Sequence, residues 1–222
     1  MSLFSGLFDR RIAVAEVPIG DPSVAIFADE AAAVATAVPR RQREYAAGRA
    51  SARRALAALG APAGPLPAGP DRLPQWPAGY VGSITHDDHY AAAAVGRIAD
   101  GVRSIGIDLE PAEPLPADLH ETVCRPEELG WLGERSASER GVLARAIFGA
   151  KECAFKCQYP LTRWMLEFDE IAVVLDPERD VFAASFLSDE VVAICGPKLL
   201  GRFRTTRASV ACAMILEGGA AR

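Results

Sequence analysis

Several features that define broad classes of protein are missing from this sequence. No stretch approaches the ~20 apolar residues that a membrane-spanning helix needs. Residues 1–11 lack the basic start and the apolar run of a secretory signal peptide. The formal net charge is -5, so the basic excess of a typical nucleic-acid-binding domain is also absent. We therefore expect no membrane or nucleic-acid partner, and a cytoplasmic protein.

Cysteine is scarce and forms no regular pattern. The chain has five, at Cys124, Cys153, Cys157, Cys195 and Cys212. An odd number, scattered mostly within apolar runs, indicates reduced thiols rather than a disulfide framework. Cys153 and Cys157 stand one helical turn apart, but no second Cys/His pair has zinc-site spacing. We expect these side chains to pack in the core.

The chain does contain enough apolar residues for a sizeable core. Of its 222 residues, 50% are hydrophobic and 24% are charged, as in ordinary globular proteins. The periodicity predicts an α+β fold with α/β-type layers in two parts, 1–100 and 101–222. Helices are expected at 29–59 (divided at Pro39), 126–132 and 139–158, the last capped by Ser138 and limited by Pro160. Strands are expected at 12–17, 24–27, 80–85, 90–95, 105–110, 171–175, 181–186, 191–195 and 209–216.

The most informative strand carries two carboxylates. Ile105, Ile107 and Leu109 alternate with Asp108 and Glu110, so both acids are expected on one face and the apolar side chains in the core. Alone, such a pair is more often a solvated face than a metal site. It gains meaning only with further ligands nearby.

A third carboxylate lies on the predicted helix 139–158. Glu152 stands between Lys151 and Lys156, and could simply form an i,i+4 pair with Lys156. If it meets Asp108 and Glu110 in space, the three oxygen ligands suit a hard cation such as Mg²⁺. Lysines beside that ion are what a pyrophosphate requires. The residues indicate a Mg²⁺-dependent enzyme acting on a phosphate ester.

Other segments add to this pattern in a fixed order. They are the arginine-rich helix from Arg40, the Trp76-Pro77 element, the run Gly82–His86, the acids described above, and the segment Tyr159–Thr162 after the helix. In order and spacing, these motifs resemble the 4′-phosphopantetheinyl transferases, closest to the monomeric surfactin/enterobactin type. The resemblance extends from about Arg40 to Leu175. It implies two similar halves, each a small sheet with a long helix, and an active site in the cleft between them.

The resemblance also implies roles for individual residues. The expected Mg²⁺ ligands, with Mn²⁺ as a substitute ion, are Asp108, Glu110 and Glu152. The expected contacts to coenzyme A, and above all to its phosphates, are Arg49, Arg53, Arg72, Thr85, His86, Lys151 and Lys156. The residues expected to act in catalysis are Glu152, Lys156 and His86, with Glu152 as acceptor of a serine proton. Residues 1–100 would then supply the nucleotide contacts, and residues 101–222 the metal and the carrier-protein docking surface.

Two residues near the predicted phosphate site depart from the pattern. Asp87 follows His86, and its negative charge would oppose phosphate binding unless it points away. His89 is an alternative phosphate contact.

The reaction implied is transfer of 4′-phosphopantetheine from coenzyme A to a serine of an apo acyl or peptidyl carrier protein, with release of 3′,5′-ADP. The pathways implied are non-ribosomal peptide, polyketide and siderophore synthesis. Two alternatives stay open: an inactive coenzyme A-binding regulator, which has little use for three metal carboxylates, and a Mg²⁺-dependent pyrophosphate hydrolase.

The carrier protein is expected to dock on residues 115–132, which follow the acidic strand. Its expected anchors are Leu119, Val123, Leu129, Trp131 and Leu132, with Arg125 as a positive contact. The alternative is that these apolar residues pack inward.

Overall fold

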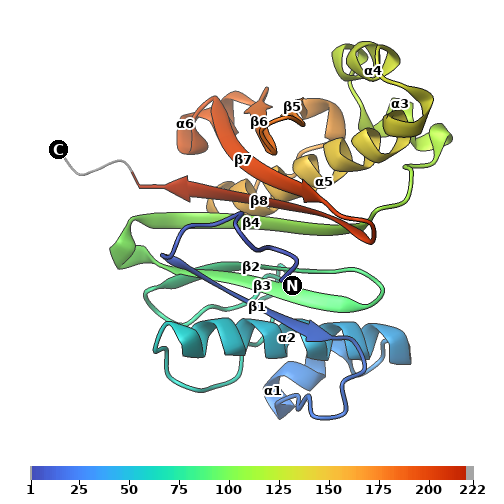
Figure 1. Cartoon of the computed structure of the whole chain (residues 1–222). Coiled ribbons are helices and arrows are strands. Elements are labelled where there is room, and N and C mark those ends of the chain that lie inside the picture. The colour runs from blue at the N-terminus through green and yellow to red at the C-terminus, as the bar shows by residue number, and fades with distance from the viewer. Residues whose placement is uncertain (1, 219–222) are drawn as a thin grey trace.

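The computed structural model describes residues 2–218 and contains two antiparallel sheets (Figure 1). The smaller sheet has the order β1–β3–β2 and the larger has the order β4–β8–β7–β6–β5. The strands are β1 (Ile12–Pro18), β2 (Tyr80–His86), β3 (Tyr90–Arg97), β4 (Val102–Pro111), β5 (Ile171–Asp176), β6 (Val181–Phe186), β7 (Lys198–Thr205) and β8 (Ser209–Glu217). The helices are α1 (Ala28–Ala31), α2 (Pro39–Ala58), α3 (His120–Val123), α4 (Pro126–Gly133), α5 (Ala137–Thr162) and α6 (Asp189–Cys195), with short 3₁₀ turns η1 (Ala32–Val34), η2 (Ile98–Asp100), η3 (Ala117–Leu119) and η4 (Phe168–Glu170). None of the helices within residues 2–218 is long and apolar enough to cross a membrane.

The sheets stack on one another, and the two long helices, α2 and α5, cover their outer faces (Figure 1). Ala92 and Ala94 of β3 pack with Ile105 and Ile107 of β4 in one buried cluster between the sheets. The alternate residues of β3 face α2. Because β3 is buried on both faces, its sequence is a continuous apolar run, residues 91–95, instead of an alternating one.

Side chains rather than a backbone ladder join the two sheets along their facing edges. The backbone N–H of Ile107 donates to Ser83 Oγ, and that of Leu109 donates to Thr85 Oγ1, both over 3.2 Å. β4 is an edge strand, so these amides would otherwise lack partners. The hydroxyls of β2 therefore fix its position beside the acidic strand.

The two halves follow the same order of elements. Each has a first strand, a long helix and a closing pair of strands, and the last strand lies between the first strand and its own predecessor. In the N-terminal half these are β1, α2, β2 and β3, and in the C-terminal half β4, α5, β7 and β8. The predicted α+β fold with two similar halves is confirmed. β5, β6, α6 and the helical segment between β4 and α5 are additions to the second half.

The sequence expectations fail at several places. Residues 24–27 form no strand, and residues 191–195 belong to helix α6. Asp189 and Glu190 in the first turn and Gly196 after the last favour a helix there, although the valine-rich sequence resembles a strand. β7, which follows, was not predicted.

The boundaries of α5 also differ from those expected. Its N-cap is Ser136 rather than Ser138, and the Glu139 side chain accepts a hydrogen bond from the Ser136 backbone N–H over 3.3 Å. Pro160 lies inside its last turn, and the helix ends only at Arg163, whose φ is +59°. A proline so near the end removes one hydrogen bond of a helix that is already closing.

Candidate active site

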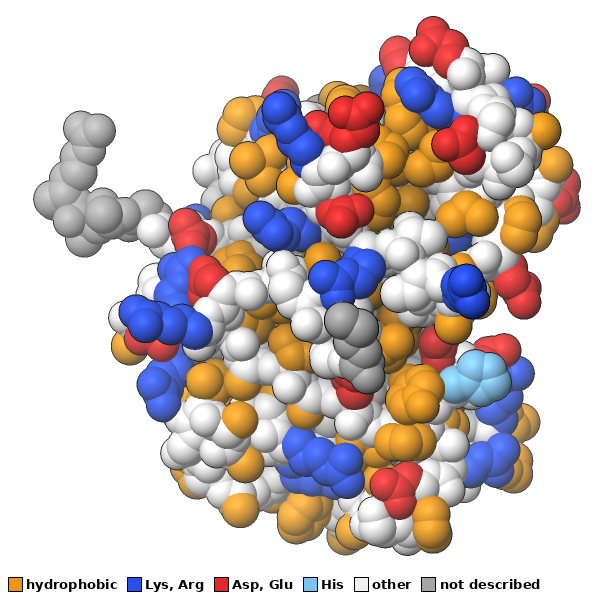
Figure 2. Space-filling view, viewed as in Figure 1, with side chains coloured by type: hydrophobic (Ala, Val, Ile, Leu, Met, Phe, Trp, Pro, Cys, Tyr) orange, Lys and Arg blue, Asp and Glu red, His pale blue; other side chains and the backbone are white. Residues whose placement is uncertain are grey.

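A cavity of about 710 Å³ lies where the two halves meet. Its N-terminal wall comes from α2, β2 and the loop 69–76, and its C-terminal wall comes from β4, α5 and Arg163. The volume is in the range of small-molecule binding sites. On the face shown in Figure 2, by contrast, basic and acidic side chains are dispersed without one continuous stripe.

A glycine sets the distance between the acidic strand and α5. A Cβ on Gly106 would overlap the carbonyl oxygen of Cys153, so only glycine permits this close approach. Cys153 Sγ in turn donates to the Gly106 carbonyl over 3.1 Å. The contact places Asp108, two residues further along β4, opposite the turn of α5 that carries Glu152.

Asp108 is the centre of the acidic wall. Its side chain is buried, and its Oδ1 accepts from Lys156 Nζ at 2.6 Å and from Thr85 Oγ1 at 3.3 Å. Burial lowers the pKa of Lys156, but Asp108 outweighs this and the pKa is raised, so Lys156 is cationic. Asp108 Oδ2 is buried without a hydrogen-bond partner. One oxygen of this carboxylate is thus open to a ligand.

Glu110 and Glu152 complete the wall. Burial and the nearby Asp108 raise the pKa of Glu110 to about 7, against the opposing effect of Arg145, whose Nη1 lies 2.9 Å from Glu110 Oε2. The pKa of Glu152 is also raised, mainly by burial and further by Asp108, while Lys156 lowers it. Asp108 thus disfavours the charged form of both glutamates, and a cation bound at this wall would relieve the repulsion.

These residues fit a hard divalent cation. Among residues 2–218, no three His, Cys, Asp or Glu side chains are already arranged as a metal cluster. Lys156 contacts one oxygen of Asp108. Asp108, whose Oδ2 has no partner, lines the cavity together with Glu110 and Glu152, and the three carboxylates provide an all-oxygen donor set. Asp108, Glu110 and Glu152 would hold such an ion.

The opposite wall carries a buried arginine. Arg49 on α2 is only 5% exposed, stacks on the Tyr45 ring with 4.3 Å from Cζ to the centroid, and lines the cavity. Its Nε has no hydrogen-bond partner, and no ion pair of Arg49 exists among the described residues. Burial lowers its pKa, although Tyr45 partly offsets this. A guanidinium held in this way suits an anionic ligand.

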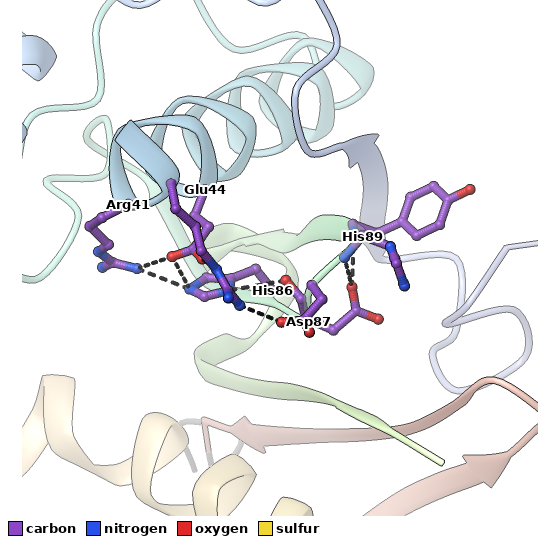
Figure 3. A network of polar contacts seen from close by, with 8 residues as sticks. Arg41, Glu44, His86, Asp87 and His89 are labelled. Carbon is purple, nitrogen blue, oxygen red and sulfur yellow. Dashed lines mark hydrogen bonds and ion pairs between the residues drawn. The ribbon is translucent and has the colours of Figure 1, made fainter. Parts of the chain in front are cut away.

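Arg41 and His86 both line the cavity, and their side chains face each other in Figure 3. Arg41 Nη1 lies 2.9 Å from His86 Nε2, and Glu44 Oε2 lies 3.7 Å from the same nitrogen. Arg41 was not among the residues expected to contact coenzyme A. Arg41, Tyr45, Gly48 and Arg49 all line the cavity, and their i, i+4, i+7, i+8 spacing on one helix was the signal that could have found it.

Asp87 and His89 point away from the cavity. Asp87 Oδ1 accepts from the backbone N–H groups of His89 and Tyr90, both over 2.7 Å, and closes the turn between β2 and β3 (Figure 3). Neither Asp87 nor His89 lines the cavity, whereas His86 does. The negative charge of Asp87 is therefore used to hold a turn.

Two expected phosphate contacts are not at the cavity. Arg53 Nη1 contacts both oxygens of the buried Glu30, at 2.5 and 2.6 Å, and ties α2 to the segment before it. Lys151 is fully buried and bonds to Glu128 and to two backbone carbonyls. Both charges are neutralised by partners within the protein. The sequence alone does not show which residues these partners are. Arg72 and Thr85, in contrast, do line the cavity.

Comparison with known proteins agrees with this geometry. The N-terminal domain model of 4′-phosphopantetheinyl transferases matches residues 29–96, and the model of the 4′-phosphopantetheinyl transferase superfamily matches residues 104–208. The chain belongs to this superfamily. As a 4′-phosphopantetheinyl transferase, it is an enzyme that transfers the phosphopantetheine group to carrier proteins.

Named relatives support the assignment over most of the length. The chain is 44% identical to 4′-phosphopantetheinyl transferase Svp of Streptomyces mobaraensis, over 82% of this chain and 72% of the relative. It is 33% identical to 4′-phosphopantetheinyl transferase PptT of Mycobacterium tuberculosis, over 92% of each chain. It is also 30% identical to enterobactin synthase component D of Escherichia coli, over 70% of this chain. The transferase thus has a relative in siderophore synthesis.

Proposed function

We propose that this transferase takes its group from coenzyme A, depends on Mg²⁺, and releases 3′,5′-ADP on modifying a carrier-protein serine. The observation that carries the proposal is the polarity of the cavity between the halves. One wall presents Arg49 without an internal partner, and the other presents Asp108 with an open oxygen beside Lys156. A ligand with phosphates and a bound cation satisfies both walls at once.

On the N-terminal wall, arginine and histidine side chains would hold the nucleotide phosphates. Arg49 suits the 3′-phosphate because its planar fork can donate two parallel hydrogen bonds. Arg41, Arg72 and His86 lie along the same cavity and are the further candidates. Residues 1–100 would accordingly recognise the nucleotide.

On the C-terminal wall, Asp108, Glu110 and Glu152 would hold the metal. When bound, Mg²⁺ neutralises charge on the pyrophosphate of coenzyme A. Lys156 would donate a hydrogen bond to a phosphate oxygen that gains charge as the leaving group departs. Residues 101–222 would therefore supply the reacting centre.

The proposed transfer needs only coenzyme A and the carrier-protein serine as reactants. The serine Oγ forms a bond to the β-phosphorus, the bond from that phosphorus to the bridging oxygen breaks, and 3′,5′-ADP leaves with the electron pair. Glu152 would accept the serine proton.

The test is the mass of a purified apo carrier protein incubated with the enzyme, coenzyme A and Mg²⁺. We expect a gain of one phosphopantetheine unit and equimolar 3′,5′-ADP. Cleavage of coenzyme A in the absence of carrier would instead support a pyrophosphate hydrolase, and tight binding without turnover would support an inactive regulator. From the resemblance to the monomeric type we also expect a monomer, which size-exclusion chromatography of the same preparation tests. Fractionation of the producing cells tests a cytoplasmic location.

A further inference from the structure

Lys151 and Glu128 form a buried ion pair that joins five segments of the C-terminal half. Lys151 Nζ lies 2.8 Å from each of three acceptors: Glu128 Oε2 and the carbonyl oxygens of Val123 and Phe168. All three protons of the ammonium group thus have acceptors. The side chain of Lys151 is fully buried, and Glu128 is 5% exposed.

Glu128 extends the network to two backbone amides. Its Oε2 accepts from the N–H of Arg125 at 2.8 Å, and its Oε1 accepts from the N–H of Val173 at 2.7 Å. The pair therefore fastens α5 to the end of α3, the start of α4, η4 and the start of β5. We call residues 112–136, which connect β4 to α5 and contain α3 and α4, the insert.

The insert projects from the body of the molecule at the upper right of Figures 1 and 2. Contacts such as those of Lys151 and Glu128 are therefore needed to hold it in place. Val123 and Leu132 are buried, and Leu129 and Trp131 pack partly against the core, so these expected docking anchors point inward. Leu119 is 41% exposed and is available to a partner.

Next to this network, a second hollow of about 170 Å³ borders Glu152. Lys151, Glu152 and Phe155 line it together with residues 165–168 and 171, and Met165 there is 67% exposed. Glu152 and Phe155 also line the main cavity, so they form the boundary between the two. No residue of the insert or of η4 lines the main cavity.

We propose that Lys151 is a positioning residue: paired with Glu128, it fixes the insert and η4 beside Glu152 and so shapes the surface that receives the carrier protein. The proposal rests on the proposed function, in which the carrier serine reaches Glu152. Coenzyme A occupies the main cavity, and the carrier approaches from the side of the smaller hollow. Lys151 itself touches neither phosphate nor serine.

The experiment compares Glu128→Gln, Lys151→Met and wild type in three measurements. These are coenzyme A affinity by calorimetry, the KM and kcat for an apo carrier protein, and amide hydrogen exchange over residues 117–133. Since hydrogen bonds to charged groups are involved, we expect Lys151→Met to raise the carrier KM about tenfold and Glu128→Gln about threefold. Coenzyme A affinity should stay within about twofold, and exchange in 117–133 should accelerate in both variants.

The two variants separate positioning from phosphate contact. If Lys151→Met weakens coenzyme A binding tenfold and Glu128→Gln does not, Lys151 is a phosphate contact and the proposal fails. An unchanged carrier KM in folded Glu128→Gln also overturns it. Should Lys151→Met not fold, the near-isosteric Glu128→Gln, which keeps an acceptor oxygen, decides the question alone.

A matched control removes general instability as a cause. Arg53→Met breaks a buried ion pair of the N-terminal half, the one with Glu30. It should lower stability and leave the carrier KM unchanged, and an equal rise in KM would overturn the positioning role. Failure of wild type to modify any carrier would refute the proposed function, whereas the calorimetry and hydrogen exchange would still report on Lys151.

Discussion

The two halves use the same order of strand, helix and paired strands to make opposite walls of one cavity. On the N-terminal wall, Arg49 is buried without an internal counter-ion. On the C-terminal wall, Asp108, Glu110 and Glu152 share the single ammonium of Lys156 and the guanidinium of Arg145. The difference shows how one architecture can bind an anion on one side and a cation on the other.

Each half also contains a buried ion pair in which the two side chains neutralise each other. Arg53 and Glu30 satisfy each other in the first half, and Lys151 and Glu128 do so in the second. Uncompensated buried charges cost stability, so proteins keep them where a ligand supplies the missing partner. A buried charge whose partner lies within the protein therefore stabilises the fold, whereas a buried charge without such a partner is available to a ligand.

The largest expected effect is on the C-terminal wall. Asp108→Ala should reduce transfer by at least about 100-fold, because it removes the partner of Lys156 and the open oxygen that a metal requires. The fold should be retained, since the change removes a polar group at the cavity wall. Transfer is measured by carrier mass, with Asp29→Ala in the exposed first turn of α1 as control. Excess EDTA should reduce transfer by the wild type to the same extent. Full transfer activity without a divalent metal would contradict the assignment.

The next test sets Arg49 against Arg53. Arg49→Ala should weaken binding of coenzyme A more than tenfold, and binding of dephospho-coenzyme A much less, because a charge-assisted phosphate contact is worth roughly 1.5–3 kcal/mol. Arg53→Ala should lower the melting temperature without this discrimination, since its partner is Glu30. Titration calorimetry with both ligands measures the difference. Equal discrimination by both variants would refute the distinction between buried charges with and without a partner within the protein.

A pH series probes the crowded acidic wall. The folded-state pKa of Glu110 is raised to about 7 from 4.5, mainly by burial and also by Asp108. The folded state therefore binds the proton more tightly than the unfolded state, so this contribution to stability is full below about pH 4.5 and is lost as pH rises through about 7. The loss is up to roughly 3 kcal/mol.

Melting curves in EDTA between about pH 5 and 8 measure this effect. Glu110→Gln, which cannot ionise, should show a flatter dependence than wild type. Adding Mg²⁺ at the upper end should restore stability to wild type more than to the variant. Parallel pH profiles for the two proteins would contradict the raised pKa.

The smallest effect concerns the mouth of the cavity, where Asp71 of the first half and Arg163 of the second form an ion pair. The pair is partly exposed and so worth at most about 1 kcal/mol. Arg163→Asp should raise the KM for coenzyme A up to about fivefold, because it places a second carboxylate beside Asp71 in a cavity that would hold phosphates. The charge-swapped double variant should recover part of the loss in the same steady-state assay. No recovery would show that the two residues act separately.

Much of the site could be predicted from local sequence. The alternation of Ile105, Ile107 and Leu109 with Asp108 and Glu110 placed both acids on one face of a strand, because side-chain direction in a strand depends only on sequence parity. The sequence does not predict that α5 covers this same face. The covering depends on the contact between Gly106 and Cys153, which are 47 residues apart in the chain.

The sequence by itself determined the two-part α+β pattern, the acidic strand, the positions of α2 and α5, and the ordered motifs that indicate the family. Tertiary structure alone decided which charges are available. Lys151 and Lys156 are five residues, about 1.4 turns, apart on the same helix. The first is enclosed by Glu128 and two carbonyls, whereas the second reaches Asp108 in the cavity. Periodicity gives the direction of a side chain, but its partners come from distant segments, and in a buried site the partners decide whether a charge is left for a ligand.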